Sequence, residues 1–185
     1  MLILSFDKFP VLETERLILR AISQGDVPAM FYQRSKRELM EYISIPLLKS
    51  KRDAEDLVKN YQFLFEQKIS ISWAITVKGS PEMIGTVGYP RISKENYRGE
   101  IGYSLDPAYW GKGYMNEAVG EVLKYGFNNL KFHRIEAVIN PENAASVNLA
   151  LKHGFVKEAY FKDYTFFDGE FWDTAVYSLL ASNYR

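Results

Sequence analysis

The sequence contains no cysteine, only two histidines and no excess charge, since 23 Lys and Arg face 23 Asp and Glu among 185 residues. The absence of cysteine excludes disulfide bonds, thiolate metal sites and a cysteine nucleophile. A formal net charge of zero provides no basic field for a phosphate backbone, so no nucleic-acid partner is expected. His133 and His153 form no HExxH pattern, so no metal site is expected, and we interpret both as surface or packing residues.

Long hydrophobic runs are also missing. No apolar stretch approaches the ~20 residues that cross a bilayer, so no membrane association is expected. Residues 1–8 contain a short apolar run without a preceding basic segment or a small-residue cleavage site, which argues against a signal peptide. A cytoplasmic location is therefore expected. No repeat, low-complexity tract or Pro/Gly/Ser-rich linker divides the chain, which predicts one domain over residues 1–185.

Two hydrophobic periodicities alternate along the chain. Runs that alternate polar with apolar residues, or that are rich in β-branched and aromatic residues, predict strands at 14–20, 69–77, 83–89, 99–105, 134–139, 156–163 and 164–180. Helical spacing predicts helices that start after Asp26, cover 54–65, extend from Gly113 to Leu130, and follow Asn143 to His153. Asp168-Gly169 is typical of a hairpin turn. This order predicts an α+β domain with one mixed sheet of about seven strands and about four helices.

Two glycines lie between an expected strand and the start of an expected helix. A loop with Gly111 and Gly113 can direct consecutive backbone N–H groups at an anion, and the helix dipole adds positive potential. The dinucleotide-binding motif would need a third glycine where Asn116 stands, and no Lys-Ser/Thr pair supports a P-loop. The pattern alone leaves two interpretations open, a phosphate site and a tight strand-to-helix turn.

Several motifs occur in one order along nearly the whole chain. They are Glu13–Arg20, Glu100–Tyr103, Trp110-Gly-Lys-Gly-Tyr-Met115 followed by Glu117-Ala118, Asn143-Ala-Ala-Ser146, and Gly154-Phe155. With this set the chain resembles the GNAT acyl-CoA N-acyltransferases, and more closely their RimJ/RimL-like branch. That branch acetylates the N-termini of ribosomal proteins and, in other members, small amines.

The resemblance implies the GNAT fold and a site for acetyl-CoA. In this fold the strands that end here at Leu105 and Ile139 splay apart, and CoA lies between them. The pyrophosphate would bind the N–H groups of the glycine loop, and the pantetheine would follow the end of the first of these strands. The cofactor-binding residues implied are Ser104, Leu105, Trp110, Gly111, Lys112, Gly113, Tyr114, Met115, Asn116 and Asn143.

The resemblance also implies catalytic roles. Glu100 would accept the amine proton directly or through a water, and Ser146 would assist the leaving thiolate. The alternatives are a solvent-facing strand glutamate and a helix-start serine that satisfies backbone groups. A serine nucleophile is disfavoured because His153 lies about 10.5 Å further along the same helix. The family often has a tyrosine acid where this chain has Ala150, so that acid is absent.

The departures affect side-chain roles more than backbone roles. Trp110 stands where the family usually has Gln or Arg, and Met115 stands where a small residue is usual. The basic cluster Lys49, Lys51 and Arg52 is interpreted as a solvated face. Aromatic residues between Tyr160 and Tyr177 are expected mostly in the core and as sheet cover, although Tyr164 or Phe166 would suit the wall of an acceptor pocket.

The expected reaction is direct transfer of an acetyl group to a primary amine in a ternary complex. The amine belongs to a protein N-terminus, ribosomal or other, or to a small molecule such as an antibiotic or polyamine. An acyl-CoA-binding sensor without turnover is the alternative from another class. Residues 26–48 and 163–171 are expected to frame the acceptor groove. The resemblance is compatible with a homodimer, which the residues themselves do not test.

Overall fold

The computed structural model describes residues 1–4 and 8–184; residues 5–7 of the N-terminal apolar run and residue 185 lie outside this part. The strands are β1 (Leu12–Glu13), β2 (Leu17–Ala21), β3 (Ile71–Val77), β4 (Met83–Ser93), β5 (Arg98–Leu105), β6 (Arg134–Ile139), β7 (Val156–Phe167) and β8 (Glu170–Leu180). The α-helices are α1 (Val27–Ser35), α2 (Lys51–Glu66), α3 (Tyr114–Asn128) and α4 (Ala144–Lys152). Short 3-10 helices are η1 (Gln24–Asp26), η2 (Arg37–Leu39) and η3 (Pro107–Tyr109). None of the helices of the described residues is long and apolar enough to cross a bilayer.

All eight strands form one mixed sheet in the order β1-β2-β3-β4-β5-β6-β8-β7. Neighbouring strands are antiparallel except β5 and β6, which are parallel. These two pair only from Arg98 to Glu100 on β5 and from Arg134 to Glu136 on β6. Beyond these residues the strands separate, which confirms the expected splay between the ends of β5 and β6.

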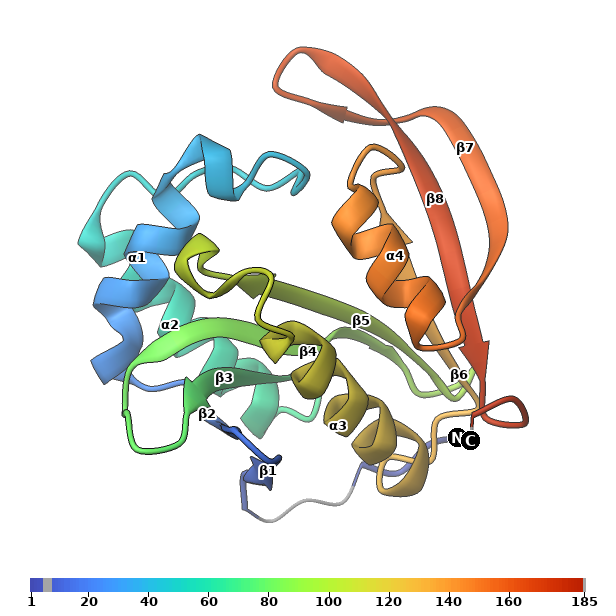
Figure 1. The fold of residues 1–185 in the computed structure, drawn as a ribbon, viewed down its shortest axis with the longest axis horizontal. Helices are drawn as coiled ribbons and strands as arrows, with labels where there is room; N and C mark the ends of the chain where they lie inside the picture. Colours follow the sequence, from blue (N-terminus) through green and yellow to red (C-terminus); the bar gives the residue numbers. More distant parts are fainter. Residues whose placement is uncertain (5–7, 185) are drawn as a thin grey trace.

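Helices cover both faces of the sheet because the buried strands carry apolar residues on both sides. Trp73 and Ile75 of β3 belong to the core beneath α3 and α4, whereas Ala74 belongs to the core beneath α1 and α2. This alternation is the period of two that a strand imposes on its side chains. Figure 1 shows α1 and α2 on one side of the molecule and α4 on the other.

The prediction of a strand over residues 14–20 is wrong for residues 14–16, which precede β2. Thr14 forms a tight turn in which its N–H donates to the Leu17 carbonyl at 3.1 Å and its hydroxyl accepts from the Leu17 N–H at 3.0 Å. The turn separates β1 from β2, which pair with each other. A side chain that competes for backbone hydrogen bonds breaks the strand, and the sheet therefore has eight strands where about seven were expected.

The C-terminal hairpin differs from expectation in the position of its first break. A break was expected after Asp163, but β7 continues to Phe167 and contains only a local irregularity there. Asp163 has φ +51°, and its N–H donates to the Asp173 carboxylate at 2.8 Å across the hairpin. The turn at Asp168-Gly169 is confirmed, with both residues at positive φ.

The aromatic residues between Tyr160 and Tyr177 were expected mostly as core and sheet cover, which is wrong for most of them, although Tyr177 is buried. Tyr160, Phe161, Tyr164 and Phe166 are all exposed, and β7 lies at one edge of the sheet. Phe161 and Tyr164 instead stack on each other with ring centroids 4.9 Å apart. Figure 1 shows this hairpin extending beyond the rest of the molecule.

Candidate active site

A cavity of about 530 Å³ opens where β5 and β6 separate. Its walls come from β3, β4, β5 and β6, from the start of α4, and from α1, α2 and the segment between them. Four of the predicted site residues line it: Glu100, Ser104, Asn143 and Ser146. Because β6 leaves β5 after Glu100, the backbone groups of β5 that face β6 beyond this residue have no strand partner.

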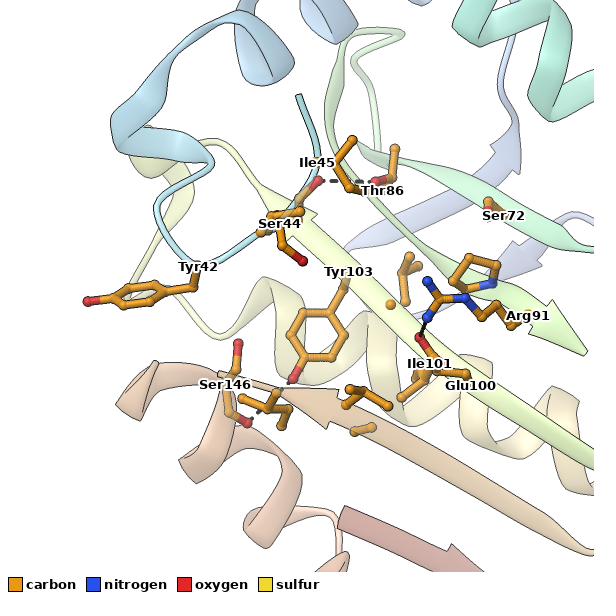
Figure 2. Close-up of a pocket in the computed structure, with 18 of the residues that line it drawn as sticks. Tyr42, Ser44, Ile45, Ser72, Thr86, Arg91, Glu100, Ile101, Tyr103 and Ser146 are labelled. Carbon is orange, nitrogen blue, oxygen red and sulfur yellow. Dashed lines mark hydrogen bonds and ion pairs between the residues drawn. The ribbon is translucent and has the colours of Figure 1, made fainter. Parts of the chain in front are cut away.

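Glu100 reaches the cavity in contact with a cation. Its Oε1 accepts a hydrogen bond from Arg91 Nη1 at 2.6 Å, and the two side chains are 21% and 76% exposed. This hydrogen bond raises the pKa of Arg91 above its ordinary value. The carboxylate therefore faces the cavity as half of an ion pair, with its remaining lone pairs available to an amine or a water (Figure 2).

Tyr103 connects the two sides of the cavity. Its hydroxyl donates to the Ser146 backbone carbonyl at 3.4 Å, so a side chain of β5 contacts the first turn of α4. Burial raises the pKa of Tyr103 above its ordinary value, so the hydroxyl is protonated at neutral pH. Sequence reasoning missed this residue as part of the site, although Tyr103 closes the motif that begins at Glu100.

The start of α4 is organised by Asn143. Its Oδ1 accepts a hydrogen bond from the Ser146 N–H at 3.0 Å, which confirms the predicted N-cap. The cap fixes Ser146 in the first turn, on the cavity wall. The hydroxyl of Ser146 has no hydrogen-bond partner among the described residues, so it is available to a ligand.

The glycine loop lies outside the cavity wall and presents open backbone donors. Gly111 and Gly113 have φ of +71° and +80°, conformations that favour glycine. The first helical hydrogen bond of α3 runs from the Glu117 N–H to the Gly113 carbonyl, and no side chain caps the helix. The N–H groups of Tyr114, Met115 and Asn116 therefore have no acceptor within the helix. This geometry fits the pyrophosphate of CoA.

The side chains of Trp110 and Lys112 both donate to backbone carbonyls that precede them in the chain. Trp110 Nε1 donates to the Leu105 carbonyl at 2.8 Å, and Lys112 Nζ donates to the Ala108 carbonyl at 2.7 Å. Leu105 packs against the core and does not line the cavity, in contrast to its neighbour Ser104. The donors that the loop offers to an anion are thus mainly its amide groups.

Arg16, in the turn just before β2, hydrogen-bonds both the glycine loop and the first turn of α3. Arg16 Nη1 donates to the Lys112 carbonyl at 2.9 Å, and Arg16 Nε donates to Glu117 Oε2 at 2.7 Å. The Thr14 hydroxyl also hydrogen-bonds the Glu117 carboxylate. Burial raises the pKa of Glu117, but the hydrogen bonds from Thr14 and Arg16 outweigh it and hold the pKa below its ordinary value. Apart from its place in the 13–20 motif, nothing in the sequence marks Arg16 as a residue of the site.

The two histidines and the basic cluster agree with their interpretation as surface or packing residues and as a solvated face. His153 is half-buried at the end of α4, close to Gly120 of α3, and burial lowers its pKa. His133 is exposed, as are Lys49, Lys51 and Arg52. Within residues 1–4 and 8–184, no three His, Asp or Glu side chains are grouped as metal ligands would be.

The segments expected to frame the acceptor groove contribute unequally. Arg34 and the segment from Tyr42 to Ile45 line the cavity, whereas residues 163–171 do not. Tyr164 and Phe166, named as candidates for the pocket wall, are 64% and 63% exposed outside it. The hairpin still contacts the first segment through an ion pair of 3.1 Å between Arg37 and Asp168.

Known proteins share this sequence and architecture. The family described as "Acetyltransferase (GNAT) domain" matches residues 16–156. An uncharacterized N-acetyltransferase of Bacillus subtilis, YoaA, is 37% identical over 93% of this chain and 97% of its own. A GNAT-family acetyltransferase of Bacillus anthracis has a solved structure with a TM-score of 0.83 and 29% identity, covering 94% of this chain and 99% of its own.

A further solved structure extends the likeness to enzymes that modify ribosomal proteins. Ribosomal-protein-S5-alanine acetyltransferase of Vibrio fischeri has a TM-score of 0.83 and 25% identity, covering 95% of this chain and 99% of its own. The family match spans most of the chain, and the splayed strands and glycine loop agree with it. The chain belongs to the GNAT acetyltransferases, a family of N-acyltransferases.

Proposed function

We propose that the protein transfers the acetyl group of acetyl-CoA directly to a primary amine within a ternary complex, with residues 1–185 forming one catalytic domain. The observation that carries the proposal is the cavity at the separation of β5 and β6, with Glu100 and Ser146 both on its wall. A site that holds two reactants side by side removes much of the entropic barrier to their reaction.

Backbone groups supply most of the proposed acetyl-CoA site. The N–H groups from Tyr114 to Asn116 and the loop from Trp110 to Gly113 would hold the pyrophosphate. Asn143 and the end of β5 at Ser104 and Leu105 would contact the pantetheine. The edge of β5 that faces β6 supports this, since its backbone groups beyond Glu100 have no strand partner on that side.

Acetyl-CoA supplies an acetyl group activated as a thioester. Glu100 accepts, directly or through a water, the proton that the amine loses as its nitrogen bonds to the acetyl carbon. Unpaired N–H groups of β5 hydrogen-bond the carbonyl oxygen as negative charge develops on it. Ser146 donates a hydrogen bond to the sulfur that leaves as the C–S bond breaks, and the thiolate takes up one proton.

An α-amine suits this site better than a lysine side chain. At pH 7, deprotonating an α-amino group of pKa about 7.7–8.0 costs roughly 1–1.4 kcal/mol, whereas lysine costs roughly 4.6 kcal/mol. Glu100 is already paired with Arg91, so it suits the amine whose deprotonation costs less free energy. We therefore propose an α-amine acceptor, on a protein N-terminus or a small molecule. A cytoplasmic location and a homodimer stay predictions.

The test is acetyl-CoA turnover, followed as free thiol, against N-terminal Ser and Ala peptides, amino acids, polyamines and aminoglycosides. We expect amine-dependent thiol release that falls about 100-fold in Glu100→Gln at unchanged CoA affinity. Gly113→Glu should lose CoA binding, because it places a side chain and a negative charge in the loop. The control is Glu136→Gln, at the paired register position on β6 and outside the cavity lining. Tight CoA binding without thiol release from any amine would support the sensor alternative instead.

A further inference from the structure

One arginine of the cavity wall has no partner for its charge. Arg34 lies in the last turn of α1 and lines the cavity. Its Nε atom is buried and has no hydrogen-bond acceptor, and its guanidinium forms no ion pair with any described residue. Protein atoms enclose Nε itself, whereas the two Nη groups are neither enclosed nor hydrogen-bonded to a described residue, so they are the donors that an anion from outside the chain would bind.

The other charged groups of the cavity do not supply that acceptor. Arg34, Arg91 and Glu100 are the charged residues among those that line it, and the Glu100 carboxylate is bound to Arg91. Figure 2 shows this ion pair at one side of the cavity, with Tyr42 and Ser44 from the segment after α1 toward the other. The described lining therefore holds one positive charge in excess.

We propose that Arg34 binds an anionic group of the acceptor, so that the protein acetylates primary amines that also carry a carboxylate or a phosphate. This inference rests on the proposed acetyl transfer and specifies its substrate class. A guanidinium offers several N–H donors in a planar fork, which matches the oxygens of either anion. A polyamine or aminoglycoside would place additional positive charge beside Arg34, so the site disfavours such acceptors.

Two other roles for Arg34 lead to different measurements. As a cation in the last turn of α1, it would stabilise the helix through the dipole, and its loss would lower Tm alone. As a ligand of CoA phosphates, its loss would raise KM for acetyl-CoA. As the acceptor's anion site, its loss raises KM only for acceptors that carry the anion.

The experiment compares matched amines at saturating acetyl-CoA, with thiol release as the readout. The pairs are L-serine and L-serinamide, Ser-Asp-amide and Ser-Asn-amide, and phosphoethanolamine and ethanolamine. The variants are Arg34→Gln and, as a control for the loss of one exposed charge outside the cavity, Arg52→Gln. Differences among the three pairs distinguish a carboxylate from a phosphate and locate the anion relative to the amine.

We expect kcat/KM for the anionic member of at least one pair to exceed that of its neutral partner by about 10- to 100-fold. Arg34→Gln should abolish this preference through KM while KM for acetyl-CoA stays constant, and Arg52→Gln should retain it. Four results would each overturn the proposal. Two concern the wild type: equal rates within every pair, or a preference for spermidine over the anionic amines. Two concern Arg34→Gln: an equal loss of kcat/KM for both members of a pair, or a raised KM for acetyl-CoA.

Binding provides a readout that does not depend on turnover. If no pair releases thiol, calorimetry of each amine with the CoA-saturated protein decides the question. Tighter binding of the anionic member, lost in Arg34→Gln, supports the acceptor's anion site even where the proposed reaction fails. Equal binding of both members overturns the site, whereas turnover without anion preference overturns this inference and leaves the proposed reaction standing.

Discussion

Arg16 Nε and Glu117 Oε2 lie 2.7 Å apart although 101 residues separate them in the chain. This contact joins the turn between β1 and β2 to the first turn of α3. Arg16 also holds the Lys112 carbonyl, so one side chain positions the backbone of the glycine loop. The loop geometry therefore depends on a residue far from it in sequence.

Glu117→Gln should raise KM for acetyl-CoA about 10-fold with little change in kcat, because it weakens the charge-assisted hydrogen bonds that hold Arg16 against the loop. Steady-state kinetics at saturating amine provide the measurement. Glu121→Gln, one turn further along α3 and paired with Lys124 at 3.5 Å, is the control. An unchanged KM in Glu117→Gln would show that the loop keeps its shape without this contact.

Gly111→Ala and Gly113→Ala should each lower stability by about 1–2 kcal/mol, because their positive φ disfavours a side chain. Both should also weaken acetyl-CoA binding. Gly79→Ala, at φ +86° in the turn after β3 and with open space around its Cβ position, should carry the same strain without changing KM. Denaturant unfolding and KM separate the two effects, and a KM change in Gly79→Ala would contradict the assignment of the loop.

Tyr103→Phe and Ser146→Ala test which hydroxyl serves the leaving thiolate. Each should lower kcat about 10-fold if its proton reaches the sulfur. Because burial raises the pKa of Tyr103 above the ordinary tyrosine value of about 10, its contribution should persist across neutral pH and be lost only as the hydroxyl ionises above that value. The pH profile of kcat in both variants is the measurement. A wild-type rate in Ser146→Ala together with a slow Tyr103→Phe would assign the proton donor to Tyr103.

Asp26 should contribute to the stability of the fold in a pH-dependent way. It is 3% exposed and bound by Arg20 at 2.7 Å. Burial raises its pKa, but the hydrogen bonds from Arg20 and Ser23 hold the pKa below its ordinary value. A lowered folded pKa means that this stability is present above about pH 4 and is lost as pH falls through the folded pKa.

Asp26→Asn should therefore cost about 2 kcal/mol at pH 7 and flatten the decline of stability below about pH 4. Urea unfolding between pH 3 and 7 gives both quantities. Asp56→Asn, which removes an exposed carboxylate paired with Lys59 at 3.5 Å, is expected to change stability by less than about 0.5 kcal/mol. Equal effects of the two substitutions would mean that burial of Asp26 does not matter.

Local patterns predicted most of the fold. The strand at 134–139, the cap at Asn143 and the hairpin turn at Asp168-Gly169 all agree with the structure, because each depends on residues within a few positions. The break at Thr14 was missed, since it depends on a side chain that competes with the strand for hydrogen bonds. The exposure of Tyr164 was missed because composition does not show which strand lies at the edge.

The sequence predicted residues of the candidate site only where they belong to one of the recognised motifs. Glu100, Ser104, Asn143 and Ser146 do line one cavity. Arg34 was missed because nothing near it in sequence differs from an ordinary helix end, and only the fold places it in the cavity wall. The pairing of Glu100 with Arg91 was missed because it crosses from β5 to β4 at a register shift.

The position of β8 has a consequence for how the sheet assembles during synthesis. β8 follows both β6 and β7 in the chain but lies between them. Until β8 leaves the ribosome, β6 has an open edge and β7 has no neighbour at all. The three strands beyond the splay, β6, β8 and β7, therefore cannot pair one after another during synthesis. A chain stalled before residue 170 would expose β6 to pairing with other nascent chains.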